Sequence, residues 1–526
     1  MHRNPRGDLF SYASPTLLLT GLLLLGGLLG GCSTNPVTGK RNFNIVSEPQ
    51  ELQIGSQQYG PSRQMQGGDY VTDPALVNYV KAVGQKVAAH SDRDLPYQFE
   101  VLNNGVPNAW ALPGGKIAIN RGLLLEMQTE AELAAVLGHE VVHAAASHGA
   151  LAMSRGMLLQ GAVLATAVAS RDSDYSRYAV GGASIAAQLV NQKYGRGAEL
   201  ESDEYGIKYM AEAGYDPQGA VELQKTFVRL SEGRRTDFLS GLFASHPPSQ
   251  ERVEKNIATA NAIGRGGKVG REEYQRAVAG LKQRKPAYDA FDDGRKALAD
   301  GNPVQATALA EKAIRLEPRE AHFYGLKGDV AFADKNYRSA VRQYSAALER
   351  NPEYFKFYLG RGESYRQLNQ LDAAERDLKA SANLLPTADA ANALGLIAER
   401  RGQVDTAIGY YEMAASSQTP AGRQSNGRLV MLDLPRRPER YIAVQTRVDT
   451  NGRVFAEIGN RTQVPVTNVT VALAYRDSAG RVRQEQRVFR GRLESARTAM
   501  VAIGTQPYAS ALNTMQLKVV SAQPIQ

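Results

Sequence analysis

The sequence predicts a multidomain protein: a mainly helical domain with a small β-sheet, then an α-solenoid, then a C-terminal domain that resembles a β-sandwich. Its 526 residues exceed what a single hydrophobic core usually serves. A central stretch repeats every 34 residues, and beyond about Gly427 apolar and polar residues alternate. Lysine and arginine are spread along the chain, whose formal net charge is +9. This balance favours an anionic membrane surface or acidic partners and argues against a nucleic-acid partner.

The first 31 residues have the organisation of a bacterial signal peptide. An arginine-containing segment precedes an apolar run at residues 17–31, which is shorter than the ~20 residues of a membrane-spanning helix. The run ends in Leu-Gly-Gly-Cys, which resembles a lipobox, and Ser33 resembles an outer-membrane sorting signal. We therefore expect Cys32 to carry a lipid anchor that holds the protein on the periplasmic side of the outer membrane; the alternative is a free core thiol. Because Cys32 is the only cysteine, no intramolecular disulfide can form.

The rest of the first half of the chain falls into three segments that differ in composition. Residues 32–47 are rich in Pro, Gly and Asn and are expected to form a flexible tether. From residue 48 to residue 265 the pattern is mainly helical, with one strand-like stretch beginning at Gly115. A glycine-rich, charged stretch follows, and we expect residues 266–287 to be a linker.

A 34-residue period marks residues 288–423. A helix-turn-helix unit of this length is typical of tetratricopeptide repeats, which stack into a solenoid that binds peptides or proteins. About four repeats are predicted, and the fourth slips by one residue as a capping repeat would; the alternative is an unrelated array of helical hairpins. The residues that keep the period include Gly294, Gly328 and Gly362, with Gly395 one residue early, then Ala306, Ala340 and Ala374, then Pro318, Pro352, Pro386 and Pro420.

The third predicted domain, residues 424–526, is rich in β-strands. Val469, Val471 and Leu473 alternate with polar or small residues, and a turn sequence follows. About 100 residues of short strands indicate a small β-sandwich. No catalytic pattern is found in this domain, so its charged residues are interpreted as a solvated face.

The segment LGHEVVHAAASHG contains the strongest chemical pattern in the chain. A capping box just before it predicts that a helix runs through it. On that helix His139 and His143 are about 40° apart, so both imidazoles can reach one ion, and Glu140 lies beside them. This is the HExxH arrangement, in which two histidines bind zinc and the glutamate is the general base. His148 is about 180° from His139 and is interpreted as a surface or packing histidine.

A third ligand would distinguish a zinc site from two histidines on an amphipathic helix. Glu199 and Asp203 are four residues apart on a predicted helix and share one face, from which Glu201 points away. Glu199 could complete a His-His-Glu site, and Asp203 could accept a hydrogen bond from a ligand imidazole. Without the HExxH segment, these residues would be interpreted as an acidic, solvated helix face.

Three segments together resemble a known family. The HExxH segment, the segment from Glu199 to Asp203, and the segment from His246 through two prolines to Arg252 are similar to those of the membrane-associated zinc metallopeptidases that include HtpX and the CAAX prenyl proteases. The stretches NPVTGKRNF and VPNAWALPGGKIAINRGLL resemble those of periplasmic lipoproteins in the family. The β-barrel assembly-enhancing proteases of this family also join such a domain to tetratricopeptide repeats. The resemblance covers the first domain closely and the repeats by architecture, but not the β-rich domain.

The resemblance implies a gluzincin-like zinc-metallopeptidase domain that holds one zinc ion per chain. It also implies that the histidine before the two prolines either occupies the fourth zinc position at rest or contacts the tetrahedral intermediate. The site residues it implies are His139, His143 and Glu199 as zinc ligands, Glu140 and His246 as catalytic residues, Asp203 as the partner of a ligand, and Arg252 as the residue that positions the His246 loop.

The expected function is zinc-dependent cleavage of misfolded or stalled envelope proteins that are held on the repeats. The alternative is an outer-membrane assembly factor or chaperone-like scaffold, in which the repeats bind the assembly machinery and proteolysis is secondary. Residues 157–169 are too short to span a membrane and form either a buried helix or a lid or membrane-facing element. An extended substrate is expected to add to an edge strand formed by Gly115, Lys116, Ile117, Ala118 and Ile119.

Overall fold

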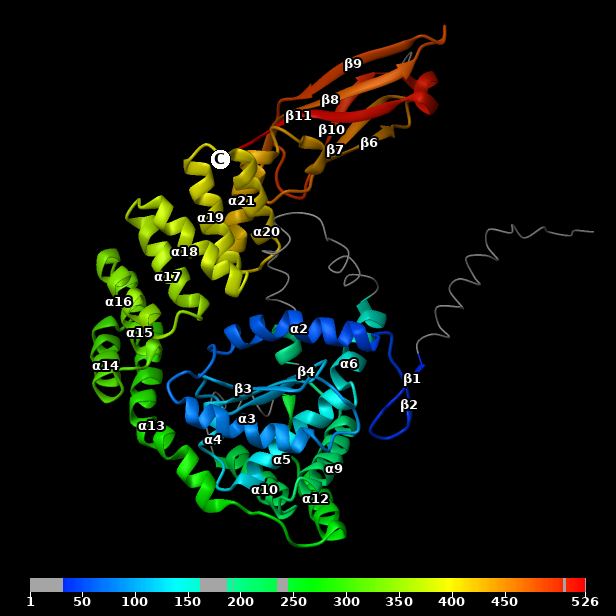
Figure 1. Cartoon of the computed structure of the whole chain (residues 1–526). Coiled ribbons are helices and arrows are strands. Elements are labelled where there is room, and N and C mark those ends of the chain that lie inside the picture. The colour runs from blue at the N-terminus through cyan, green and yellow to red at the C-terminus, as the bar shows by residue number, and fades with distance from the viewer. Residues whose placement is uncertain (1–31, 161–186, 192, 234–244, 505–507, 526) are drawn as a thin grey trace, which may run out of the picture. The chain divides into compact units, whose positions relative to one another are not determined.

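The computed structural model describes residues 32–160, 187–191, 193–233, 245–504 and 508–525. These residues form two units, the first ending at Phe323 and the second starting at Tyr324 (Figure 1). The expected signal peptide and most of the apolar stretch 157–169 lie outside the described residues. Among the residues that are described, no helix is both long and apolar enough to cross a membrane.

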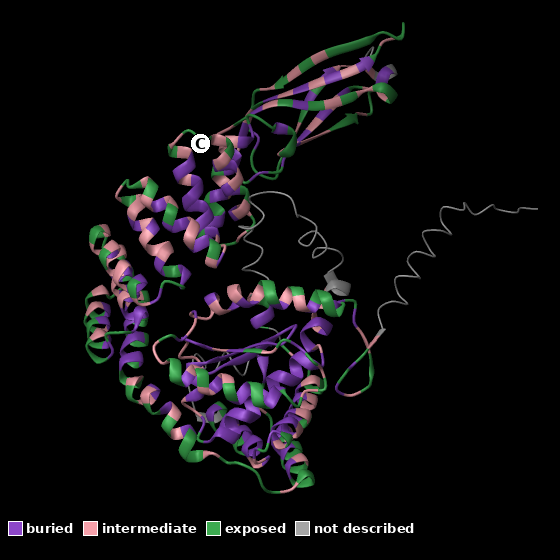
Figure 2. Cartoon of the chain, in the orientation of Figure 1, coloured by how far each residue is buried: buried purple, intermediate pink, exposed green. Residues whose placement is uncertain are grey.

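A three-stranded sheet lies at the centre of the first unit. It consists of β3 (Gln98–Leu102), β5 (Lys116–Asn120) and β4 (Ala109–Leu112), in that order. One face is covered by α2 (Glu48–Met65), and the other by α3 (Pro74–Ala88) and α5 (Glu130–Ala145) (Figure 1). The sheet and the whole of α5 are almost entirely buried (Figure 2), so α5 is held by the core on every side.

The position of β5 contradicts the expected edge strand at residues 115–119. β5 pairs in parallel with β3 and antiparallel with β4, so both of its sides are occupied. All five of its residues are buried. The strand-like composition was interpreted correctly, but strand order depends on partners distant in sequence. In this sheet the edge strands are β3 and β4.

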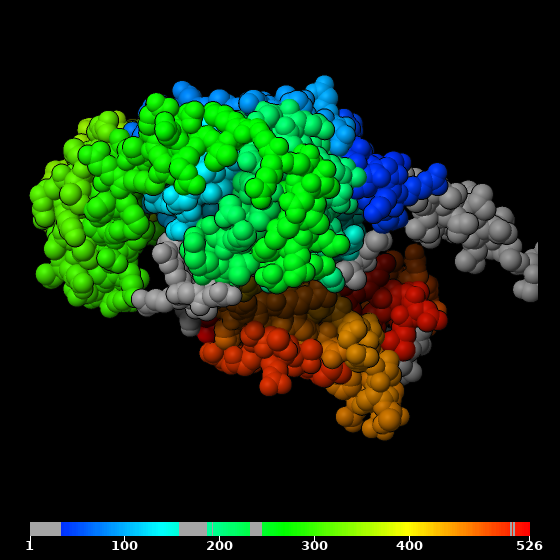
Figure 3. Space-filling model, turned by 90° about the horizontal axis from the view of Figure 1, so that it is seen from below, coloured from blue at the N-terminus to red at the C-terminus, as the bar shows by residue number. Residues whose placement is uncertain are grey.

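The remaining helices of the first unit surround α5. α4 (Arg121–Leu124) follows β5 directly, and α9, α10 and α12 contact α5 or one another. On the face drawn in Figure 3, the helices α9 to α13 form much of the surface of this unit. The bounds of these helices are α6 (His148–Gln160), α9 (Arg196–Glu212), α10 (Gln218–Gly233), α12 (Gln250–Ile263), α13 (Arg271–Ala299) and α14 (Pro303–Leu316).

The expected flexible tether at residues 32–47 is instead a folded hairpin. β1 (Cys32–Thr34) pairs antiparallel with β2 (Arg41–Phe43). The side chains of Val37 and Val46 are buried, and the Ser154 hydroxyl on α6 donates to Asn44 Oδ1 at 2.9 Å. Contacts with residues far along the chain order a segment whose own composition predicts flexibility.

The expected linker at residues 266–287 is largely the first half of α13. This helix runs without a break from Arg271 to Ala299. Its early residues Tyr274, Val278 and Leu281 are fully buried, and the Tyr274 hydroxyl donates to the Leu124 carbonyl at 2.7 Å. The first half of α13 therefore belongs to the core of the first unit.

Paired helices continue in the second unit, and a close glycine–side-chain contact recurs in them. A Cβ on Gly328 would lie 2.6 Å from the Tyr344 ring, and one on Gly395 would lie 2.5 Å from the Tyr411 ring. The period seen in sequence thus marks where two helices approach too closely for any side chain. The helices are α15 (Ala321–Ala333), α16 (Tyr337–Arg350), α17 (Phe355–Gln367), α18 (Leu371–Leu384), α19 (Ala388–Arg400), α20 (Val404–Ala415) and α21 (Pro420–Asp433).

Two antiparallel three-stranded sheets form the C-terminal part, as the alternating pattern predicts. Their strand orders are β10-β7-β6 and β11-β8-β9, and both sheets contribute to one apolar core. The expected boundary at residue 424 falls inside α21, so the β-rich region begins later, at β6. The strands are β6 (Ile442–Val448), β7 (Val454–Asn460), β8 (Val466–Arg476), β9 (Val482–Phe489), β10 (Thr498–Gly504) and β11 (Gln516–Pro524).

Candidate metal centre

All the candidate ligands except His246 come from α5 and α9, which cross at two glycines. A Cβ on Gly138 would lie 2.8 Å from the Gly206 carbonyl oxygen, and a Cβ on Gly206 would lie 2.8 Å from the backbone nitrogen of His139. Only glycine permits this approach at both positions. It brings the histidines of α5 opposite the carboxylates of α9.

Replacing Gly138 with alanine is expected to weaken zinc binding and lower the free energy of unfolding by about 1–3 kcal/mol, because the new methyl group meets backbone that cannot rotate away. Zinc titration and thermal denaturation would measure both effects. Gly156 on α6 is the matched control, since a Cβ there meets nothing within 4 Å. Equal behaviour of the two variants would contradict the close-crossing explanation.

Four buried side chains converge at this crossing: His139, His143, Glu199 and His246. Each offers one ligand atom, and all four atoms lie within 4.8 Å of one another. The His143 Nε2 atom is 3.0 Å from His139 Nε2 and 3.4 Å from Glu199 Oε1. The His246 Nδ1 atom is 3.0 Å from Glu199 Oε1 and 3.3 Å from His139 Nε2.

These separations fit a tetrahedral zinc site. Zinc bonds to nitrogen and oxygen of about 2.0–2.1 Å place the corners of a tetrahedron about 3.3 Å apart. Two imidazole nitrogens 3.0 Å apart can both direct a lone pair at one shared cation. The donor set of imidazole nitrogens and one carboxylate is also one that zinc prefers.

Asp203 and Arg252 hold the ligand side chains in place through hydrogen bonds and an ion pair. The Asp203 Oδ1 atom lies 2.9 Å from His139 Nδ1, which leaves Nε2 directed at the site. Arg252 donates to both carboxylate oxygens of Asp203, at 2.6 and 2.7 Å, and forms an ion pair with Glu199 at 2.9 Å. Arg252 also donates to the Pro247 carbonyl at 3.3 Å. One guanidinium therefore connects two carboxylates of α9 with the backbone after His246.

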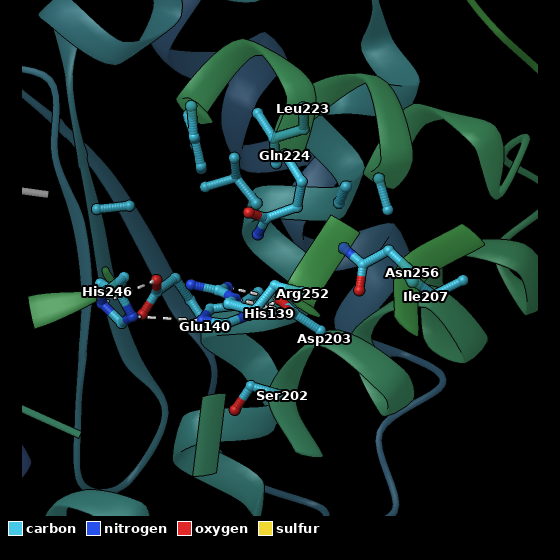
Figure 4. A pocket seen from close by; sticks show the side chains of 15 residues that line it. His139, Glu140, Ser202, Asp203, Ile207, Leu223, Gln224, His246, Arg252 and Asn256 are labelled. Carbon is cyan, nitrogen blue, oxygen red and sulfur yellow. Dashed lines mark hydrogen bonds and ion pairs between the residues drawn. The ribbon is translucent and has the colours of Figure 1, made fainter. Parts of the chain in front are cut away.

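Glu140 lies beside this cluster but outside the ligand set (Figure 4). Its Oε1 atom is 3.7 Å from His246 Nε2. Its Oε2 atom is buried and has no hydrogen-bond partner among the described residues, so it is available to a water or a substrate group. A small pocket with a volume of about 30 Å³ begins here, and apolar side chains such as Val136, Leu223 and Phe227 line it.

Burial and neighbouring charges set the protonation of the cluster. Burial raises the pKa of the Glu140 carboxyl, which His246 and His139 oppose only in part. Burial lowers the pKa of His143 well below its usual value. Burial also disfavours the charged form of Glu199, but His246 and hydrogen bonds from two imidazoles hold its pKa well below the usual range. A neutral imidazole and an ionised carboxylate are the forms that bind a metal.

The interpretation of His148 as a surface or packing histidine missed its contact with the cluster. The helical phase was continued past Ala145, where α5 ends. Ser147 has a φ of 56°, and α6 starts in a new direction at His148. The side chain of His148 is buried, with Nδ1 3.0 Å from His143 Nδ1. Positive φ at a serine has no clear sequence signal.

Tyr194 is a second residue that sequence reasoning did not single out. Its ring stacks on the His143 imidazole, with ring centroids 4.0 Å apart and an interplanar angle of 30°. The same ring lies 5.7 Å from that of His246. The tyrosine therefore limits how the ligand imidazole can turn.

Comparison with known proteins agrees with this geometry. Residues 74–259 match peptidase family M48. The first unit contains an M48 peptidase domain. Residues 328–382 and 362–423 match the tetratricopeptide repeat, so the predicted metallopeptidase family and its combination with repeats are confirmed.

Curated relatives each match part of this chain. The putative β-barrel assembly-enhancing protease of Vibrio cholerae is 30% identical over 190 residues, which are 35% of this chain and 39% of the relative. Metalloprotease YcaL of Escherichia coli is 31% identical over 34% of this chain and 66% of its own length. Mitochondrial metalloendopeptidase OMA1 of Schizosaccharomyces pombe is 28% identical over 48% of this chain and 72% of its own length.

Proposed function

We propose that the protein is a zinc-dependent endopeptidase that cleaves misfolded or stalled proteins of the bacterial cell envelope. The observation that carries this proposal is the convergence of His139, His143 and Glu199 beside Glu140, whose buried Oε2 atom has no hydrogen-bond partner among the described residues. Those three residues would hold the ion, and Glu140 would be the base.

Zinc bound there would polarise the scissile carbonyl and make a hydroxide available near neutral pH. Glu140 accepts the proton of the attacking water and delivers it to the leaving amine. The raised pKa of Glu140 suits this role. A carboxylate with a low pKa would be too weak a base to accept the proton and then return it. Asp203 and Arg252 keep the His139 imidazole and the Glu199 carboxylate in place during both steps.

His246 is the fourth residue of the cluster. A catalytic zinc site needs one position for water. We therefore propose that His246 would occupy that position at rest and would give it up to the attacking water. From the displaced position its imidazole could still donate a hydrogen bond to the tetrahedral intermediate.

An extended substrate segment would add to β4, the edge strand next to α5. Ala109 of β4 lines the same cavity as His139 and Glu140. Backbone pairing with an edge strand requires a substrate without its own tertiary structure. The repeats would hold the rest of such a substrate, as tetratricopeptide arrays commonly bind peptides.

Cleavage is expected for an unfolded chain and not for the same chain when folded. A disulfide-stabilised protein and its reduced, alkylated form provide this comparison with one sequence, and gel electrophoresis would follow the products. A zinc chelator added to the unfolded sample is the control and should stop cleavage. Equal cleavage of the two forms would contradict the requirement for an extended segment.

A scaffold for outer-membrane assembly remains the second candidate, favoured by the matched repeats. In that function the repeats and the β-sandwich would bind the assembly machinery, and proteolysis would be secondary. In either function, a lipid on Cys32 would fix the protein to the periplasmic face of the outer membrane.

A further inference from the structure

A series of polar side chains, buried except for the partly buried Glu201, connects the N-terminal hairpin with His143. The Nδ1 atom of His143 lies 3.0 Å from Nδ1 of His148. The Nε2 atom of His148 lies 3.3 Å from Glu201 Oε1. That same oxygen accepts a hydrogen bond of 2.7 Å from the Asn35 side chain, in the turn between β1 and β2 (Figure 1).

The donor and acceptor roles in this series of hydrogen bonds are consistent in one direction. An imidazole that offers Nε2 to a metal carries its proton on Nδ1. His148 must then accept at Nδ1 and carry its own proton on Nε2, which faces the Glu201 carboxylate. The Asn35 amide orientation is fixed as well, because its Oδ1 atom accepts from the backbone nitrogens of Val37 and Thr38. The Ser202 hydroxyl is the other neighbour of His148 Nδ1, at 3.4 Å.

The turn between α5 and α6 is built so that His148 faces back toward His143. Arg93 donates to the Ser147 hydroxyl at 2.8 Å and forms an ion pair with Glu51 at 2.9 Å. The Ser147 hydroxyl in turn donates to Glu51 at 3.1 Å. The reversal of the chain at Ser147 is thus fixed by a partly buried network that includes a charged pair.

We propose that His148, Glu201 and Asn35 are positioning residues that keep Nε2 of His143 directed at the metal site. The affinity for zinc then depends on docking of the N-terminal hairpin, which carries Asn35 three residues after Cys32. This inference rests on the proposed zinc function. Partners of metal-bound histidines typically change metal affinity by about 10–100-fold when they are removed.

The test uses the full-length protein and two readouts. Competition with a chromophoric chelator gives the zinc dissociation constant, and the visible spectrum of the cobalt-substituted protein reports the ligand geometry. His148→Phe keeps a ring beside His143 but removes the acceptor, so zinc affinity should fall about 10–100-fold and the cobalt spectrum should shift. His148→Asn places an oxygen near the former Nδ1 position, so it should restore most of the zinc affinity and most of the wild-type cobalt spectrum.

His322→Phe is the matched control. His322 is also a buried histidine of the first unit that contacts a carboxylate, but its partners are Glu320 at 3.0 Å and the Gly67 carbonyl at 2.9 Å. This variant should lose thermal stability without a change in zinc affinity or cobalt spectrum. If both variants lose affinity in parallel with their stability, the positioning role is overturned.

Asn35→Ala changes no residue of α5, α6 or α9. It therefore tests the proposal independently if the His148 variant misfolds. It should weaken zinc binding by a smaller factor than His148→Phe, and it should have no further effect when both substitutions are combined, because the two residues act through one chain. Independent, additive effects would overturn the proposal. If the wild-type protein binds zinc and His148→Phe binds it equally well, only the positioning proposal is rejected. If the wild-type protein binds no zinc, the proposed function is rejected together with the positioning proposal.

Discussion

Replacing Glu140 with glutamine is expected to abolish peptide-bond cleavage while zinc remains bound. The amide has nearly the same shape as the carboxylate but cannot accept the proton of the attacking water. Glu140 is not among the converging ligands, so the ion should be retained. General-base catalysis typically contributes about 10²–10⁴-fold, and the rate on an unfolded substrate should fall by that factor. Metal analysis of the same sample would verify the zinc content.

Glu132→Gln is the matched control for this experiment. Glu132 is buried on the same helix, where its carboxylate accepts a hydrogen bond from the Gln128 backbone at 2.6 Å. An amide oxygen can accept that bond, so activity should persist. Cleavage at the wild-type rate by Glu140→Gln would contradict the assignment of the base. Loss of cleavage together with full genetic complementation would favour the scaffold function over the protease.

Replacing His143 with alanine is expected to remove nearly all zinc from the purified protein. The imidazole supplies Nε2, one of the converging ligand atoms, which lies 3.0 Å from His139 Nε2 and 3.4 Å from Glu199 Oε1. Its loss also leaves His148 and Tyr194 without the ring that they contact. Zinc quantification after gel filtration would measure the effect, and the stabilisation of the wild-type protein by added zinc should disappear.

His90→Ala is the control for His143→Ala. His90 follows α3, is partly exposed, and lies 3.7 Å from Glu212, far from the ligand set in sequence. Its replacement should leave the zinc content at the wild-type level. An unchanged zinc content in His143→Ala would exclude this histidine as a ligand.

Within single helices, sequence periodicity predicted correctly which residues share a face. His139 and His143, like Glu199 and Asp203, lie on unbroken helices, so helical phase places each pair on one face. The 34-residue period succeeded for the same reason, because each repeat packs mainly on its neighbour. His148 was missed because helical phase has no meaning beyond Ala145, where the helix ends.

Features that depend on distant partners could not be predicted. The hairpin at residues 32–43 consists of two three-residue strands, and Asn35 reaches a carboxylate 166 positions away. The position of β5 at the centre of its sheet depends on two separate pairings. The charged, glycine-rich stretch that leads into α13 resembles a linker, and the role of the buried residues at the start of α13 is revealed only when α4 is placed beside them.

The single helix α13 determines where this chain can be divided. Tyr274, near its first turn, is fully buried and bonded to Leu124, whereas Ala297, near its last turn, is buried where α14 packs. A truncated protease that ends at residue 265 would uncover apolar side chains and invite aggregation. Beyond α14, Glu320 still accepts hydrogen bonds from Thr72 and Asn103. A fragment that retains the chain through Phe323 preserves these contacts, so we expect the shortest stable fragment that contains the M48 domain to include the helix pair α13 and α14.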